Sequence, residues 1–249
     1  MRLDAALVAR GLARSRGQAS DLIANGRVRV NGRPARKASV PVGDTDLIAA
    51  ETDPWVSRAA HKLLGALDAS GTVVAGRALD AGASTGGFTQ VLLARGCERV
   101  YAVDVGHGQL ADAVARDPRV VGREGLNVRD LTLADVDGRP VDLVVADVSF
   151  ISLTLLLAPL RAVTAPGGTA ILLVKPQFEL GRTALDSRGV VADPALAATA
   201  VDLVAEAASG AGWSERWRGP SVLPGERGNQ EYVIGLVTVE DRNVARPVR

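Results

Sequence analysis

Ala78-Leu79-Asp80-Ala81-Gly82-Ala83-Ser84-Thr85-Gly86-Gly87-Phe88-Thr89 is the stretch of this sequence that decides the fold. A short apolar run reaches an acidic residue and enters a loop of glycine, alanine and hydroxyl residues, which opens a predicted helix to about Arg95. Small residues let a ligand approach the backbone, and a helix N-terminus favours anions. The glycine spacing differs from that of the dinucleotide fingerprint. The stretch therefore predicts the first strand, loop and helix of an α/β fold with a ligand site.

Apolar runs alternate with helical segments beyond this stretch. Strands are predicted around residues 78–79, 100–103, 120–121, 141–146 and 170–174. Buried strands separated by helices predict a parallel, doubly wound sheet. Two further strands, at 221–223 and 232–239, flank a Pro-Gly turn and predict a hairpin, so one strand runs antiparallel. The predicted fold class is α/β, a Rossmann-like, mostly parallel seven-stranded sheet with one antiparallel strand, preceded by a helix over 57–69 that Ser57 caps.

The first fifty residues predict a separate, basic module. Residues 1–43 hold nine Arg and Lys against two Asp and Glu, a net charge of +7, whereas the remainder carries −6. Helical spacing predicts a helix capped by Asp4 and a second capped by Ser15, followed by a hairpin at Asn31-Gly32 and a strand near 46–48. We expect a small α+β domain at 1–50, a linker at 51–56 and the main domain at 57–249. The charge favours a polyanionic partner over a merely solvated face.

This module resembles the RNA-binding domain first defined in ribosomal small-subunit protein four. The resemblance is carried, in register, by Arg2-Leu3-Asp4, Gly11-Leu12-Ala13-Arg14-Ser15-Arg16 and Gly26-Arg27-Val28-Arg29-Val30-Asn31-Gly32. It implies that basic side chains bind RNA phosphates, which position an RNA without reading its sequence. The residues expected on that surface are Arg2, Arg14, Arg16, Arg27 and Arg29.

Composition argues against several classes of protein. The chain is 47% hydrophobic and has one cysteine, Cys97, so we expect a globular protein without a disulfide framework and without a metal site. No secretion signal is visible at the N-terminus, and the longest nearly apolar stretch, 148–160, is too short to cross a bilayer. We expect a cytoplasmic protein with no membrane partner; the oligomeric state is open, with a monomer favoured.

Two acidic residues accompany the glycine loop. Asp80 precedes it, and Asp104 ends the next strand, at the distance where an acidic residue binds ribose hydroxyls. A purely structural turn is the alternative for the loop alone. The combined order resembles the class I S-adenosylmethionine-dependent methyltransferases, which implies S-adenosylmethionine as cofactor. The expected cofactor-binding residues are Asp80, Gly82, Ser84, Thr85, Gly86, Gly87, Phe88, Thr89 and Asp104.

The strand ends indicate the acceptor. Cys97 follows the first helix, at the wrong edge for methylation of cytosine C5, and Asp147-Val148-Ser149-Phe150 differs from the Asn/Asp-Pro-Pro-aromatic motif of base-amino methyltransferases. Asp147 and Lys175 end the fourth and fifth strands, on the carboxyl edge where ligands bind. Glu231 begins the antiparallel strand, and Lys62 lies in the first turns of a helix that starts near the same edge. The topology predicts that these four charged residues converge.

A lysine at the end of a buried strand can act as a base towards a hydroxyl, because burial and a cationic neighbour lower the pKa of an amine. We expect Lys175 to be that base, Asp147 to orient it, and Lys62 and Glu231 to hold the acceptor hydroxyl and the lysine. The chain has three lysines and 26 arginines, which indicates that arginine would not serve at 62 and 175. The alternatives are a structural Lys175–Asp147 ion pair and a surface position for Lys62.

The set Lys62, Asp147, Lys175 and Glu231 resembles the Lys-Asp-Lys-Glu set of FtsJ-type ribose 2′-O-methyltransferases. Further motifs along nearly the whole chain resemble the TlyA family, often called haemolysins: Ser57-Arg58-Ala59-Ala60-His61-Lys62-Leu63, the loop at 82–89, Asp147-Val148-Ser149-Phe150-Ile151-Ser152, Val174-Lys175-Pro176-Gln177-Phe178-Glu179 and Gly228-Asn229-Gln230-Glu231-Tyr232. The resemblance implies methylation of cytidine 2′-hydroxyls in ribosomal RNA, with ribosomal RNA or a ribosomal subunit as partner, and Phe150 and Phe178 shaping the acceptor pocket. Family members associated with both ribosomal subunits have extra residues before the Arg-Leu-Asp start and a longer C-terminal helix. Few residues lie at these places here, so the resemblance implies large-subunit RNA, with small-subunit RNA as the other option.

Two other interpretations stay open. One is a non-enzymatic RNA-binding or ribosome-assembly factor with a vestigial methyltransferase fold; the intact set of four residues and the glycine loop argue against it. The other is a membrane-active haemolysin, which the lack of a spanning segment or a basic amphipathic helix disfavours.

Overall fold

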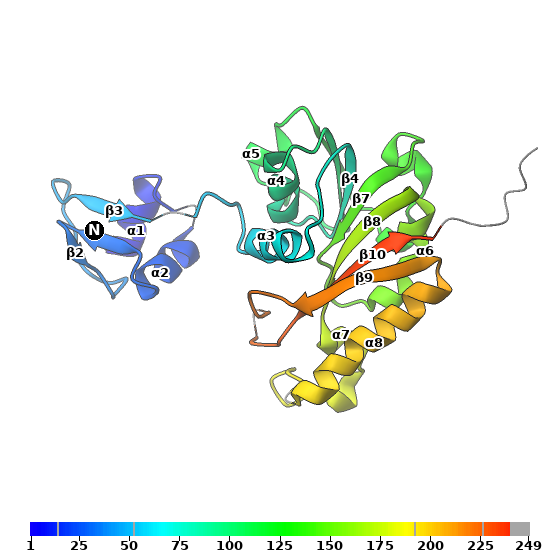
Figure 1. Cartoon of the computed structure of the whole chain (residues 1–249). Coiled ribbons are helices and arrows are strands. Elements are labelled where there is room, and N and C mark those ends of the chain that lie inside the picture. Colours follow the sequence, from blue (N-terminus) through cyan, green and yellow to red (C-terminus); the bar gives the residue numbers. More distant parts are fainter. Residues whose placement is uncertain (14, 52, 192, 226, 240–249) are drawn as a thin grey trace, which may run out of the picture. The chain divides into compact units, whose positions relative to one another are not determined.

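The computed structural model describes residues 1–13, 15–51, 53–191, 193–225 and 227–239 (Figure 1). It divides into two compact units, Met1–Pro54 and Trp55–Arg249. The division falls inside the segment predicted as a linker, while the domain boundaries at 50 and 57 stay predictions. Each unit has its own buried apolar residues, so each is described by itself.

The N-terminal unit packs two helices against a small antiparallel sheet. Its elements are α1 (Leu3–Ala9), α2 (Arg16–Ala24), β1 (Val28–Val30), β2 (Arg33–Pro34) and β3 (Ile48–Ala50), with sheet order β2-β1-β3. Ser15 caps α2 as predicted, because its Oγ accepts a hydrogen bond from the backbone N–H of Gln18 at 3.2 Å. The prediction that Asp4 caps α1 is wrong: Arg2 is the N-cap residue, and Asp4 lies in the first helical turn, where two arginines bind its carboxylate.

The C-terminal unit is built on a seven-stranded sheet in the order β6-β5-β4-β7-β8-β10-β9. Its strands are β4 (Arg77–Ala81), β5 (Arg99–Asp104), β6 (Val120–Glu124), β7 (Val141–Ala146), β8 (Thr164–Val174), β9 (Trp213–Pro220) and β10 (Tyr232–Thr238). Its α-helices are α3 (Ala59–Ser70), α4 (Gly87–Ala94), α5 (Asp112–Ala115), α6 (Leu157–Ala162), α7 (Pro176–Glu179) and α8 (Pro194–Gly210). Short 3₁₀ turns are η1 (Val128–Asp130), η2 (Leu133–Val136), η3 (Leu153–Leu155) and η4 (Arg182–Ala184).

The predicted fold class is confirmed, since β10 pairs antiparallel with both β8 and β9 and the other pairs are parallel. The first strand of the hairpin was predicted at 221–223, which is wrong, because β9 lies at Trp213–Pro220. An edge strand needs few apolar residues, and the charged residues of β9 hide its period of two. The prediction that Ser57 caps the first helix is also wrong: α3 follows Arg58 and has no side-chain cap.

Helices cover both faces of this sheet. Residues of α3 and α4 pack with one face of the central strands, and residues of α6 and α8 pack with the other (Figure 1). Successive residues of β7 alternate between the two clusters: Leu143 and Val145 belong to one, Val144 and Ala146 to the other. A sheet buried on both faces leaves its carboxyl edge as the place where polar side chains can gather.

Candidate active site

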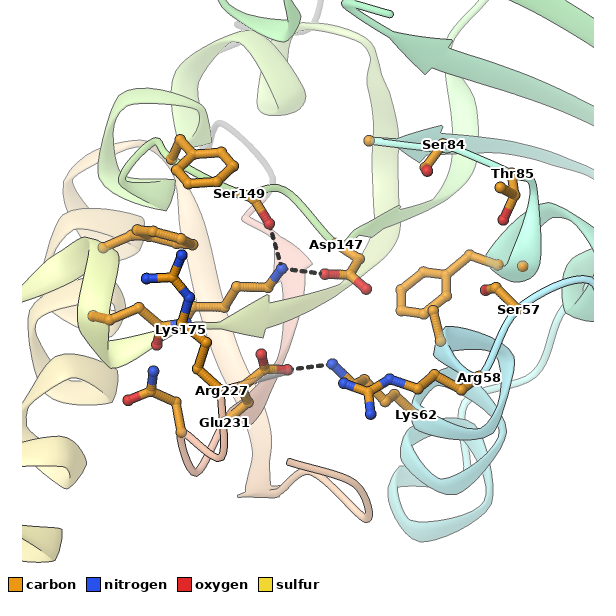
Figure 2. A pocket seen from close by; sticks show the side chains of 18 of the residues that line it. Ser57, Arg58, Lys62, Ser84, Thr85, Asp147, Ser149, Lys175, Arg227 and Glu231 are labelled. Atoms are coloured by element: carbon orange, nitrogen blue, oxygen red, sulfur yellow. Dashed lines mark hydrogen bonds and ion pairs between the residues drawn. The ribbon is translucent and has the colours of Figure 1, made fainter. Parts of the chain in front are cut away.

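A cavity of about 590 Å³ opens at the carboxyl edge of the sheet, within the size range of small-molecule sites (Figure 2). Its walls come from the start of α3, the loops after β4, β7 and β8, and the loop between β9 and β10. The lining residues are Ser57, Arg58, Ala59, Lys62, Gly82, Ala83, Ser84, Thr85, Gly87, Phe88, Asp147, Ser149, Phe150, Lys175, Gln177, Phe178, Leu185, Gly189, Arg227, Asn229 and Glu231. All four charged residues predicted to converge are among them.

Lys175 contacts a carboxylate, that of Asp147, and a hydroxyl, that of Ser149, at this cavity. Its Nζ lies 2.6 Å from Asp147 Oδ1 and donates a hydrogen bond to Ser149 Oγ at 2.9 Å (Figure 2). The two charged side chains are only 10% and 15% exposed. The backbone explains this pairing: Lys175 directly follows β8 and Asp147 directly follows β7, and these strands are parallel neighbours. The sheet therefore holds both groups at one level of its edge.

Lys62 and Glu231 form a second pair on the same cavity. Lys62 Nζ donates to Glu231 Oε2 at 2.5 Å, and the side chains are 6% and 3% exposed. Lys62 sits in the first turns of α3, and Glu231 lies immediately before β10. Lys62 is thus a buried member of an ion pair, which contradicts its alternative as a surface residue. A buried pair of this kind is destabilised by any change that leaves one charge alone.

The glycine loop after β4 forms the adjoining wall. Gly82 has φ 84°, and a Cβ there would lie 2.7 Å from the backbone oxygen of Asp147, so only glycine lets the two strand ends come this close. Ser84, with φ 46°, donates its backbone N–H to Asp104 Oδ2 at 2.8 Å. Asp104 Oδ1 accepts the N–H of Gly106 at 2.8 Å. Asp104 thus fixes the glycine loop through hydrogen bonds, and both of its oxygens keep lone pairs that can accept further hydrogen bonds.

The predicted cofactor residues divide between the cavity and the layer beneath it. Gly82, Ser84, Thr85, Gly87 and Phe88 line the cavity. Asp80 and Thr89 are fully buried, and Thr89 Oγ1 donates to Asp80 Oδ2 at 2.6 Å, which ties the start of α4 to β4. Gly86, Asp104, Asp80 and Thr89 do not line the cavity and support the loop instead. Within the described residues, Asp80 Oδ1 is a buried atom with no hydrogen-bond partner.

Burial raises the pKa of Asp80 to about 7, against the hydrogen bonds from Thr89. Between about pH 4 and pH 7 the carboxyl is protonated in the folded chain and ionised in the unfolded chain, so the free energy of unfolding falls as pH rises through this window and levels off above it. A difference of about three pKa units corresponds to roughly 4 kcal/mol.

Asp80→Asn is expected to remove this slope. Denaturant unfolding at pH 4.5 and 7.5 measures it, and Asp68→Asn, which changes a carboxylate that is 63% exposed, is the matched control. A slope in Asp80→Asn as steep as in the wild type would rule out Asp80 as its source.

Two aromatic residues lie at the cavity, where the family resemblance implied them. The rings of Phe150 and Phe178 have centroids 5.3 Å apart and an interplanar angle of 48°. Phe150 is 90% exposed and has φ 65°, a left-handed conformation that is unfavourable for a bulky residue. An exposed aromatic side chain in a strained backbone position is a reason to consider Phe150 as a candidate for ligand contact.

Sequence reasoning missed several polar residues of the cavity. Ser149 contacts Lys175, and Asn229 is 2% exposed, with Oδ1 accepting from Val191 N and Nδ2 donating to Gly189 O, both at 3.0 Å. Arg58 and Arg227 also line the cavity. Ser149 lies two residues after Asp147, and Asn229 lies two residues before Glu231. Both stand inside motifs that carry the family resemblance, and this closeness to predicted site residues was the available signal for them.

In the N-terminal unit, Asp4 organises two of the predicted RNA-binding arginines. Arg2 Nε lies 3.0 Å from Asp4 Oδ1 and Arg16 Nη2 lies 2.8 Å from Asp4 Oδ2. These guanidinium groups hold the pKa of Asp4 well below its usual range. Arg27 and Arg29 are exposed, and Arg29 donates to the backbone oxygen of Gly32 at 3.2 Å. The fifth predicted residue, Arg14, lies outside the described residues.

Metal-binding clusters and membrane spans are both absent from the described part of the chain. No group of three or more His, Cys, Asp or Glu side chains in it is placed to hold a metal ion. No helix there combines the length and apolar character needed to cross a membrane.

Comparisons with known proteins agree with this architecture. The family model described as FtsJ-like methyltransferase matches residues 55–238, and that of the S4 domain matches residues 1–48. A 16S/23S rRNA (cytidine-2′-O)-methyltransferase, TlyA of Mycobacterium tuberculosis, is 52% identical over 97% of this chain and 91% of its own. A 23S rRNA (cytidine-2′-O)-methyltransferase, TlyA of Campylobacter jejuni, is 30% identical over 88% and 92%. The solved structure of a candidate hemolysin from Streptococcus thermophilus superposes with a TM-score of 0.77 at 34% identity, covering 96% of this chain and 89% of that one.

Proposed function

The chain belongs to the TlyA family, FtsJ-like methyltransferases with an N-terminal S4 domain, and from that premise we propose that it transfers a methyl group from S-adenosylmethionine to a cytidine 2′-hydroxyl of ribosomal RNA. The observation that carries the proposal is the arrangement of two buried lysine–carboxylate pairs, Lys175–Asp147 and Lys62–Glu231, on one cavity beside a glycine loop. Ribose O-methylation needs such groups, because the hydroxyl must be positioned and lose its proton.

The cavity fits the proposed donor. Its loop wall consists of small side chains and backbone at Gly82, Ala83 and Ser84, which allow a ligand to approach closely. Gly82, Ser84, Thr85, Gly87 and Phe88 would contact the cofactor, Gly86 and Thr89 would support this loop, and Asp104 would be the ribose-binding carboxylate. When bound, S-adenosylmethionine supplies an electrophilic methyl group on a sulfonium. The residues of the chain do the rest, by orienting the acceptor oxygen and taking up its proton.

Lys175 is the proposed base. Its Nζ is held between the carboxylate of Asp147 and the hydroxyl of Ser149, which aims the amine into the cavity. The charged group in contact with Lys175 is the anion Asp147, whereas the sequence pattern suggested a cationic neighbour. The other lysine, Lys62, forms its ion pair with Glu231. In this proposal Lys62 and Glu231 hold the 2′-hydroxyl. Lys175 first gives one proton of its ammonium group to solvent, and its neutral Nζ then takes up the proton of the hydroxyl.

Phe150 and Phe178 are proposed to receive the base of the target nucleotide. Sequence-specific RNA recognition relies on unstacked bases that stack on aromatic side chains, and the exposed ring of Phe150 offers such a face at the cavity. The target strand would then present its ribose to the two ion pairs.

Transfer of labelled methyl groups to purified ribosomal subunits tests the proposal. We expect incorporation into RNA of subunits isolated from cells that lack the gene, and mapping of the product should place the label on cytidine 2′-oxygens. Both subunits are assayed, because relatives named for 16S/23S and for 23S RNA both align over most of the chain. RNA binding without transfer would favour an assembly factor, and cofactor-independent lysis of red cells would favour a haemolysin.

The S4 domain is proposed to anchor the ribosomal RNA through its arginines. The logarithm of affinity falls with the logarithm of salt concentration by about 0.7 to 0.9 per phosphate contact. Arg16→Ala combined with Arg29→Ala is therefore expected to reduce the slope by roughly 1.5, as measured by filter binding between 50 and 200 mM salt. Arg116→Ala, at an arginine 80% exposed in the other unit, is the matched control and should keep the wild-type slope. An unchanged slope in the double variant would move the RNA contacts elsewhere.

A further inference from the structure

The loop between β9 and β10 contacts Arg58, the N-cap residue of α3, and two residues of the helix itself. Arg58 Nη2 contacts the backbone oxygen of Pro224 at 3.5 Å, and Lys62 pairs with Glu231. One turn further along, Gly65 lies against the side chain of Val222. Helix residues spaced by four and three share a face, so the loop runs along a single side of α3.

Because Gly65 has no side chain, it leaves space for the side chain of Val222. A Cβ at Gly65 would lie 2.6 Å from Val222 Cγ1, closer than such atoms approach in proteins, and 3.0 Å from Cγ2, which is a tight contact. The backbone of Gly65 is helical, so its conformation does not require glycine. Glycine in the middle of a helix destabilises it relative to alanine. The helix therefore gains nothing from this glycine, whereas the contact with the loop depends on it.

A displaced Val222 would disturb Glu231 through the backbone. The residue before it, Ser221, donates its N–H to the backbone oxygen of Glu231 at 2.9 Å. Gly225 packs under the carboxylate, since a Cβ there would lie 2.6 Å from Glu231 Oε1. The far end of the loop is anchored by buried Asn229, which is hydrogen-bonded to Gly189 and Val191. Because these hydrogen bonds hold that end, we expect a backbone shift at Val222 to be passed to the segment that carries Glu231.

We propose that Val222 seated on Gly65 is the positioning contact that places Glu231, and through it Lys62, for the transfer reaction. Gly65 and Val222 are positioning residues, since neither is placed among the lining residues of the cavity. The effect on catalysis rests on the proposed function, whereas the effect on the loop does not. The two are measured separately.

Gly65→Ala tests the contact. We expect kcat for methyl transfer to fall at least tenfold with KM for S-adenosylmethionine unchanged, because Glu231 is misplaced while the glycine loop is not. The thermal stability of Gly65→Ala should not fall in proportion to the loss of kcat, since alanine favours the helix. Adding Val222→Ala restores the space, and the double variant is expected to return to within threefold of wild type. Val222 is 60% exposed, so this truncation removes little buried surface.

Gly210→Ala is the matched control, because Gly210 is likewise a helical glycine without a positive φ, and no atom lies within 4 Å of the place its Cβ would take. Hydrogen exchange of residues 221–231 should rise in Gly65→Ala and return in the double variant, whatever the substrate is. Wild-type activity and exchange in Gly65→Ala would overturn the proposal. Return of hydrogen exchange to the wild-type rate without recovery of kcat in the double variant would overturn it too. If no variant, wild type included, methylates RNA, the proposed function fails and the exchange result still decides the contact.

Discussion

Lys175→Ala is expected to reduce methyl transfer by about 10³-fold while leaving S-adenosylmethionine binding close to wild type. General base catalysis by a positioned side chain contributes about 10² to 10⁴, and the amine of Lys175 is held between Asp147 and Ser149 at the cavity. The expected cofactor residues lie on the other wall, after β4, so their contacts should survive. Single-turnover transfer to ribosomal RNA measures the rate, and calorimetry measures the cofactor affinity.

Lys175→Arg separates the proton acceptor from the positive charge. Arginine keeps the charge beside Asp147 but does not release a proton at accessible pH, so this variant is expected to be as inactive as Lys175→Ala. An active Lys175→Arg enzyme would show that charge alone is required and that Lys175 is a structural partner of Asp147. Ser149→Ala, which removes only the hydrogen bond to Nζ, is expected to cost much less than either.

Glu231→Ala is expected to have the largest effect on stability. It leaves the ammonium of Lys62 buried at 6% exposure without its carboxylate, and breaking a buried pair in this way costs about 3 to 5 kcal/mol. In a unit of this size each kcal/mol lowers Tm by about 2 to 4 °C, so we expect a fall of roughly 6 to 20 °C together with loss of transfer. Calorimetric unfolding and the methyl-transfer assay measure the two effects.

Lys62→Met combined with Glu231→Leu distinguishes a structural pair from a catalytic one. Replacing both charges by apolar groups removes the unpaired ion, so most of the lost Tm is expected to return. Activity should not return if the pair holds the acceptor hydroxyl. A stable double variant that still methylates ribosomal RNA would assign Lys62 and Glu231 to the fold alone.

The sequence predicted the parallel core well, because β4, β5, β7 and β8 each contain a short apolar run and the spacing between these runs leaves room for helices. It failed at β9, whose charged outer residues hide its alternation, and at the two helix starts, where Asp4 and Ser57 have the right chemistry for a cap. Capping depends on where the backbone turns, and Arg2 and Arg58 occupy those turns. The prediction that Ser15 caps α2 was correct because the backbone does turn into the helix at that residue.

By itself, the sequence determined the order of the elements, the edge at which the four charged residues meet and the glycine loop beside them. Those features follow from periodicity and from the rule that parallel strands end on one edge. The sequence already led us to expect Asp147 beside Lys175. Only the tertiary structure decided that Lys62 pairs with Glu231, since that contact depends on how α3 packs near the start of β10. It alone showed that Asp80 lies beneath the cavity and that Val222 occupies the space left by Gly65. Contacts between residues so far apart in the chain arise from packing, and no local pattern encodes them.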